Sequence, residues 1–124
     1  MNSVQLLGNL ARDPEVRYTK TGKAVASYTI AATNTYATAE GEVKEHTAFV
    51  QCVAWGRTSD AISPLKKGDR VFTQGRLQVR SYEDKEGKKR YVTEVVADFA
   101  AAQPKDGGGN FEQFGAANEE NIPF

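Results

Sequence analysis

Side chains alternate between apolar and polar along the stretch from Arg70 to Tyr82, and this alternation strongly constrains the fold. Successive side chains of a β-strand point to opposite faces. One face would carry Val71, Thr73, Gly75, Leu77 and Val79. The other would carry Arg70, Phe72, Gln74, Arg76, Gln78, Arg80 and Tyr82. The pattern predicts a strand with one face in a core and one face that mixes cations with aromatic rings.

Other segments rich in Val, Thr, Tyr and Phe predict strands at 4–10, 25–35, 46–55 and 90–99. Glycine-bearing turns separate them, at Thr21-Gly22, Glu40-Gly41 and Glu86-Gly87. One short helix is predicted over 59–65, with Ser59 or Asp60 as its N-cap. Three strands, a helix and two strands is the order of a five-stranded OB-fold barrel, so we predict an all-β fold of that kind. A generic six-stranded barrel fits the periodicity almost as well.

The composition changes after Gln103, where glycine and polar residues predominate. Such a segment buries too little apolar surface to offset chain entropy. Residues 1–103 hold 15 Lys or Arg against 12 Asp or Glu, and residues 104–124 hold one against four. We therefore predict one domain over 1–103 with a net charge of +3, followed by a flexible acidic tail over 104–124 with −3. This asymmetry matches a polyanion-binding domain with an acidic appendage.

The predicted strand 46–55 also has two distinct faces. Ala48, Val50, Cys52 and Ala54 form a core face, whereas Thr47, Phe49, Gln51, Val53 and Trp55 share the other. Nucleobases stack on aromatic rings at roughly 1–3 kcal/mol each, and guanidinium groups attract phosphates. The two strands together predict a surface for nucleic acid, although an ordinary solvated face fits the pattern about equally well.

No catalytic or cofactor-binding constellation is evident. The chain has one histidine, His46, no metal-ligand spacing and no phosphate-cradling glycine loop, so we predict no enzyme, cofactor or metal. A metal-dependent nuclease would use carboxylate clusters such as Asp13 with Glu15, but this cluster lies in turn-like, basic-flanked sequence. Cys52, with its apolar neighbours, is expected to be a small buried residue. No export signal or membrane-spanning stretch is evident, which predicts a cytoplasmic protein.

Several motifs resemble the bacterial single-stranded DNA-binding proteins in order and spacing. They are Leu6-Leu-Gly-Asn-Leu10, Asp13-Pro-Glu-Val-Arg-Tyr18, Lys66-Lys-Gly68, Gln74-Gly-Arg-Leu77, Arg90-Tyr-Val-Thr-Glu-Val-Val96 and the ending Asn121-Ile-Pro-Phe124. The resemblance covers residues 3–100 nearly without gaps. It implies a homotetramer that protects single-stranded DNA during replication, recombination and repair, in the cytoplasm with the nucleoid.

The resemblance also implies roles for individual residues. Its base-stacking positions match Tyr36, Phe49, Trp55 and Tyr82, of which Tyr36, Phe49 and Tyr82 replace the tryptophans found in the best-known members. Its phosphate-binding positions match Arg17, Lys44, Arg57, Lys66, Lys67, Arg76 and Arg80.

The last six residues resemble the family's docking peptide for replication, recombination and repair proteins. They are Glu119, Glu120, Asn121, Ile122, Pro123 and Phe124, joined to the body by a linker shorter than the family often has. An OB module for RNA or for a replication-restart partner is the alternative, and such a module has no need of the Ile-Pro-Phe ending.

Overall fold

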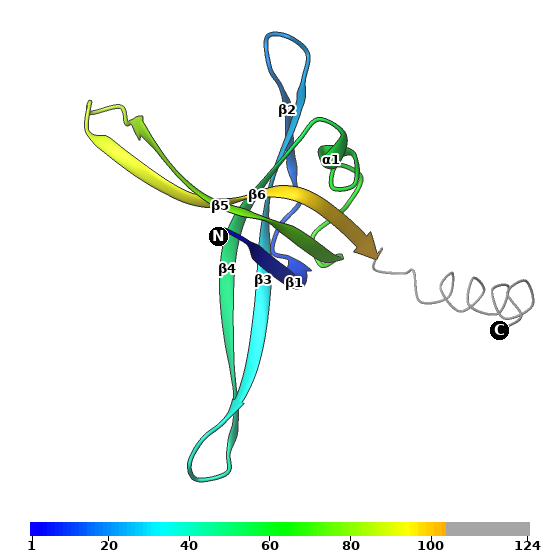
Figure 1. Ribbon diagram of the computed structural model, residues 1–124, viewed down its shortest axis with the longest axis vertical. Coiled ribbons are helices and arrows are strands. Elements are labelled where there is room, and N and C mark those ends of the chain that lie inside the picture. Colours follow the sequence, from blue (N-terminus) through cyan, green and yellow to red (C-terminus); the bar gives the residue numbers. More distant parts are fainter. Residues whose placement is uncertain (104–124) are drawn as a thin grey trace, which may run out of the picture.

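The computed structural model describes residues 1–103, and within them the chain forms six strands and one short helix (Figure 1). The elements are β1 (Val4–Leu10), β2 (Glu15–Tyr18), β3 (Ala24–Ala37), β4 (Val43–Trp55), α1 (Arg57–Asp60), β5 (Arg70–Glu83) and β6 (Lys89–Gln103). The predicted acidic tail, residues 104–124, lies outside the described residues.

The sheet closes on itself. Its order is β1-β5-β6-β4-β3-β2, and β1 also pairs with β3 at Asn9↔Ala31 and Leu10↔Ile30. The ring β1-β5-β6-β4-β3 is a closed five-stranded barrel, in which only the β4–β6 pairing is parallel. The all-β prediction of a five-stranded barrel with one short helix is therefore confirmed. The sequence analysis missed β2, which pairs with β3 beside β1.

The barrel core forms where the predicted alternation places it. Tyr28 and Ile30 of β3 are almost fully buried, as is Cys52 of β4. The phenol of Tyr28 lies 2.9 Å from the hydroxyl of Thr73 on β5, so the two buried polar groups satisfy each other across the barrel. Within residues 1–103, no buried side-chain nitrogen or oxygen lacks a hydrogen-bond partner.

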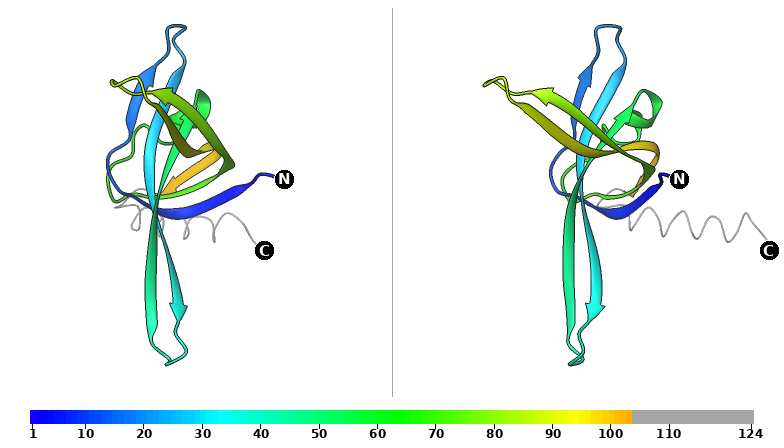
Figure 2. Two further views of the ribbon diagram at one scale, coloured as in Figure 1. Left: turned by 90° about the vertical axis from the view of Figure 1, so that its left-hand side faces the viewer. Right: turned by 60° about the vertical axis from the view of Figure 1, so that its left-hand side comes forward.

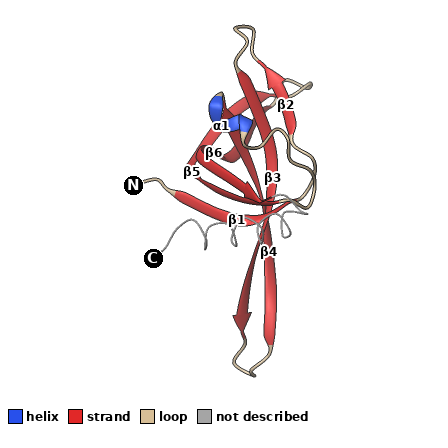
Figure 3. Cartoon of the chain, turned by 90° about the vertical axis from the view of Figure 1, so that its right-hand side faces the viewer, coloured by secondary structure: helices blue, strands red, loops and turns tan. Residues whose placement is uncertain are grey.

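The helix differs from its prediction. It spans Arg57–Asp60 rather than 59–65, and its N-cap is Gly56, not Ser59 or Asp60. Gly56 has a φ of 56°, which ends β4 and turns the chain directly into the helix. Beyond it, the amides of Ile62 and Leu65 donate to carbonyls three residues back, and both side chains are buried in the core. Core packing thus holds 61–65 as tight turns beside the barrel (Figure 3).

Two long hairpins, β3–β4 and β5–β6, project from the barrel in different directions (Figures 1 and 2). The predicted apolar face of β5 is correct only at its start. Gly75 is buried, but Leu77 and Val79 are 46% and 61% exposed. The β5–β6 register shifts between Gln74 and Gly75, and beyond this bulge the hairpin extends past the barrel, where the described chain does not cover it. Ala48 of β4 is also exposed, because it lies on the β3–β4 hairpin that projects from the barrel (Figure 1).

Candidate nucleic-acid interface

One face of β4 presents two aromatic rings to solvent. Phe49 is 68% and Trp55 43% exposed, whereas Cys52 and Ala54, which point the other way, are buried in the core. The register sets Val25 of β3 opposite Trp55, and Ala31 opposite Phe49. Core packing of the alternate side chains therefore fixes both rings on the outside of the barrel, as the sequence predicts.

A cation lies on the same face. Arg17 of β2 pairs with Val25 of β3, which in turn pairs with Trp55 of β4. Residues in register on neighbouring strands point to the same side of a sheet. The guanidinium of Arg17 is exposed and forms no ion pair within residues 1–103. The row Arg17, Val25 and Trp55 places an exposed guanidinium two strands from an exposed aromatic ring.

A polar cleft borders this face. It lies between the β2–β3–β4 surface and the base of the β5–β6 hairpin, and it is lined by Arg12, Glu15, Arg17, Ser27, Tyr28, Thr29, Gln51, Cys52, Arg80 and Glu94. Arg12 donates a hydrogen bond of 3.2 Å to the hydroxyl of Thr29. The sequence analysis did not single out Arg12, Ser27 or Thr29. Ser27 and Thr29 face Val53 and Gln51 in the register, so the parity of the second predicted strand would have found them.

Two residues that line the cleft, Tyr28 and Cys52, are buried and have raised pKa values. Cys52 is 2% exposed, and burial, followed by the negative charge of Glu94, raises the pKa of its thiol to about 12. Burial likewise raises the pKa of Tyr28 above its ordinary value, against the opposing effect of the bond to Thr73. Both groups keep their protons at neutral pH, and the expectation that Cys52 is a small buried residue is confirmed.

The β3–β4 hairpin carries the third predicted ring. Tyr36 pairs directly with Lys44, and both side chains are exposed. Tyr36 and Lys44 have even sequence numbers, whereas Phe49 and Trp55 have odd ones, so the two sets of side chains point to opposite faces of the paired strands. Tyr36 therefore lies on the other face of the hairpin ribbon. The four predicted stacking residues do not form one continuous row.

The β5–β6 hairpin carries Tyr82, the fourth predicted ring, which is 47% exposed and pairs with Arg90. Two predicted phosphate ligands share its register parity, and each meets an acid of β6. Arg80 Nε lies 2.7 Å from Glu94 Oε1, and Arg76 Nη1 lies 2.8 Å from Asp98 Oδ1. Both arginine side chains remain 52% exposed, so they are held in place without being withdrawn from solvent.

The tip of this hairpin is organised by Asp84. Its carboxylate accepts hydrogen bonds from the Arg90 side chain and from the amides of Glu86 and Lys88, each at 2.9 Å. The Arg90 guanidinium, foremost among these donors, holds the pKa of Asp84 below its usual value. The tip is therefore a defined turn.

The remaining predicted phosphate ligands lie on α1 and in the loop between α1 and β5. Arg57 begins α1, two residues after Trp55, and its side chain is exposed. The amide of Lys67 donates to the Asp13 carboxylate at 2.8 Å and the amide of Lys66 to Asp69 at 2.9 Å. These bonds hold the loop by its backbone and leave both lysine side chains exposed.

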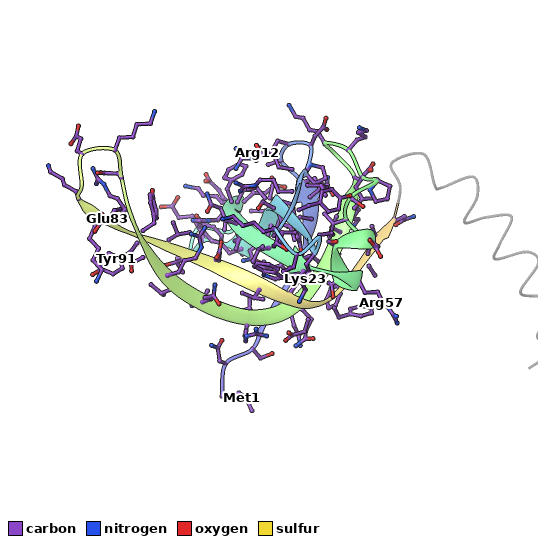
Figure 4. All side chains as sticks on the ribbon, turned by 90° about the horizontal axis from the view of Figure 1, so that it is seen from above. Met1, Arg12, Lys23, Arg57, Glu83 and Tyr91 are labelled. Atoms are coloured by element: carbon purple, nitrogen blue, oxygen red, sulfur yellow. The ribbon has the colours of Figure 1, made fainter. Side chains whose placement is uncertain are left out.

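Lys23 is a residue near the rings that the sequence analysis missed. It precedes β3, and its Nζ lies 5.7 Å from the centroid of the Trp55 ring. Figure 4 shows it on the barrel with Arg12 and Arg57, while Glu83 and Tyr91 mark the projecting β5–β6 hairpin. The pairing of the turn with the end of β4 brings Lys23 to Trp55, and that long-range register is invisible in local sequence.

Two further findings bear on the type of site. Within the described part of the chain, no three His, Cys, Asp or Glu residues gather as metal ligands. No helix between residues 1 and 103 has the length and apolar character needed to cross a membrane.

Comparisons with known proteins agree on one family. The model of the family described as "Single-strand binding protein family" matches residues 1–103. A single-stranded DNA-binding protein of Bacillus cereus is 42% identical over 122 residues, which cover 97% of this chain and 69% of the relative. The single-stranded DNA-binding protein A of Bacillus subtilis is 42% identical over 123 residues, covering 98% and 69%.

Solved structures show the same fold. A deletion mutant of the single-stranded DNA-binding protein from Thermus aquaticus superimposes with a TM-score of 0.74 at 29% identity, covering 86% of this chain and 52% of that one. A Plasmodium falciparum SSB in complex with single-stranded DNA gives a TM-score of 0.73 at 23% identity, covering 82% and 94%.

Proposed function

Because this chain belongs to the single-strand binding protein family, we propose that it binds single-stranded DNA with little sequence preference. Bases stack on Tyr36, Phe49, Trp55 and Tyr82, and phosphates meet the basic side chains around them. Those side chains are Arg17, Lys44, Arg57, Lys66, Lys67, Arg76 and Arg80, with Arg12 added from the cleft. The chain acts by binding and performs no catalysis.

The observation that carries this proposal is the exposed face of β4. Phe49 and Trp55 point outward from a barrel whose alternate residues are buried, and Arg17 lies in register two strands away. Large exposed rings beside cations are costly to leave in water and well suited to stack bases and neutralise phosphates. Every base has a π face, so such a surface holds a strand without reading its sequence.

The direct test is competition among three ligands: oligo(dT), the matching RNA and duplex DNA. Trp55 is the only tryptophan, so its emission reports the site without a label. We expect oligo(dT) to quench it, to bind tighter than the duplex, and to lose affinity as salt rises because bound counterions are released. Stronger binding of RNA would point to an RNA module instead, and saturation without quenching would remove Trp55 from the site.

We further propose that the chain assembles as a homotetramer, so that one strand contacts several barrels. The support is an apolar outer face on the β1–β5–β6 sheet. Leu7 and Phe99 are 52% and 54% exposed on this face, and the Phe99 ring lies 6.2 Å from that of Phe72. Contiguous apolar surface of this kind marks interfaces. Sedimentation at micromolar concentration tests the assembly, since a mass near the 13.6 kDa of one chain would refute it.

The cellular role follows from the same family membership. We infer that the protein covers single strands during replication, recombination and repair in the cytoplasm, and that residues 119–124 dock partner proteins there. Pro123 restricts the peptide before binding, and Phe124 offers an apolar ring. Its upstream acids attract basic partner surfaces.

A further inference from the structure

Lys23 is held beside the Trp55 ring by its own turn. Its amide donates to the hydroxyl of Thr19 at 3.0 Å, and its carbonyl accepts from the Thr19 amide at 2.9 Å. Its Cε lies 3.4 Å from the place that a Cβ on Gly56 would occupy, so the stem runs along the backbone that follows Trp55. The ammonium therefore reaches the ring from a fixed starting point.

We propose that Lys23 is a positioning residue of the Trp55 stacking site, which exchanges the indole for a phosphate when a strand binds. In the free protein its ammonium lies 5.7 Å from the centroid of the indole, which is still 43% exposed with the lysine in place. A base that stacks on that face displaces the ammonium, and Lys23 then pairs with a phosphate of the bound strand. The proposal rests on the stacking role of Trp55 proposed above.

The chemistry favours this exchange. A lysine cation is attracted to the face of a tryptophan, but at an exposed site the attraction is weak. A phosphate carries a full negative charge, and the flexible four-carbon stem lets the compact ammonium follow it. Lys23 is exposed, and the described chain gives its ammonium no acidic partner that would compete with the phosphate.

The exchange makes removal of Lys23 act in two opposite directions. Losing a phosphate contact weakens binding at low salt and flattens the slope of log K against log salt by about 0.7. Without Lys23, no ammonium competes with a base for the Trp55 ring, so the affinity for DNA rises by about two- to fivefold, which is the value of an exposed cation–π contact. This gain in affinity remains at high salt. The affinities of the wild-type protein and of Lys23→Ala should therefore cross as salt rises.

The experiment is an oligo(dT) titration of the full chain, followed by Trp55 quenching from low to molar salt. The variants are Lys23→Ala, Lys23→Arg and the matched control Lys89→Ala. Lys89 Nζ lies 5.7 Å from the centroid of the Tyr91 ring, which gives a cation–π pair at the same distance but away from the cleft. We expect the plot of log K against log salt for Lys23→Ala to cross the wild-type plot. We also expect the Trp55 emission of the free variant to differ from that of the free wild-type protein. Lys23→Arg should keep the wild-type slope, and Lys89→Ala should not cross.

Each other outcome has one meaning. A Lys23→Ala line parallel to that of the wild type, or an equal change in Lys89→Ala, overturns the exchange while leaving the stacking site intact. A wild-type protein that binds without quenching refutes the stacking role of Trp55 itself, and with it the exchange. The melting temperature of Lys23→Ala should match that of the wild type, since the side chain lies outside the core, and a lowered one would assign Lys23 a structural role instead.

Discussion

Replacing Trp55 by alanine removes one stacking ring with little effect on the core. The side chain is 43% exposed, whereas the neighbouring core residue Ala54 is fully buried. Stacking on one ring is worth roughly 1–3 kcal/mol, so Trp55→Ala should weaken oligo(dT) binding about five- to 150-fold. The change in melting temperature should be modest, because the ring lies outside the buried core cluster and 43% of the side chain is already in contact with water.

Phe49 makes this prediction sharper. It lies six residues from Trp55 on the same strand, a separation of about 20 Å at the usual rise of a strand. Changes that far apart add within about 0.5 kcal/mol. Phe49→Ala together with Trp55→Ala should therefore cost about 2–6 kcal/mol, the sum of the two single losses.

The assay is fluorescence anisotropy of a labelled oligo(dT), because Trp55→Ala has no tryptophan left to report binding. Tyr91→Ala is the matched control, since Tyr91 is 68% exposed and pairs with Ser81, with parity opposite to that of Tyr82. Its affinity should stay near that of the wild type. A folded Trp55→Ala protein that binds as tightly as this control would refute the stacking face.

Four further changes test other parts of the molecule. Glu94→Gln should tighten oligo(dT) binding at low salt only, because it removes a cleft carboxylate that pairs with Arg80 and repels phosphate, and a salt series checks this. Gly75→Val should lower the melting temperature strongly, because a Cβ there would overlap the backbone of β6. Asp84→Asn should loosen the β5–β6 tip, measured by faster amide exchange at the tip. The pKa of Asp84 is depressed, so its contribution is full above the usual 3.8 and is lost as pH falls through the lower folded value. Deleting residues 122–124 should leave oligo(dT) binding nearly intact and abolish capture of replication and repair proteins from a lysate, whereas retained capture would refute docking by the tip.

Local alternation was sufficient to predict the barrel core and the outward rings of β4. Cys52 and Trp55 follow from parity alone, and the turn glycines Gly22, Gly41 and Gly87 all have the positive φ that their turns require. The helix was misplaced because Ile62 and Leu65 are drawn into the core, and tertiary packing outweighs a cap signal there.

What the sequence could not give depends on contacts between distant segments. Leu77 and Val79 follow the apolar pattern, yet the hairpin leaves the barrel at the bulge and exposes both. The ion pair of Arg76 joins it to a residue 22 positions away, and the pairing of Lys23 with Trp55 depends on how a turn meets the end of β4. Parity within one strand carries no information about such partners.

The ion pairs on β5 indicate how affinity is divided between charge and stacking. Arg76 and Arg80 are each paired with an acid of β6. The Arg76–Asp98 pair is half-exposed on both sides and contributes only about 0–1 kcal/mol, whereas the Glu94 side chain that meets Arg80 is only 10% exposed. A bound phosphate should therefore draw Arg76 from its partner more readily than Arg80, and the carboxylate left near the DNA backbone should cancel part of the gain. Phosphate contacts made by ion-paired arginines should therefore orient the DNA backbone more than they add affinity. The rings of Phe49 and Trp55 have no such opposing charge, and stacking is not screened by salt, so they should supply most of the binding that remains when salt is high.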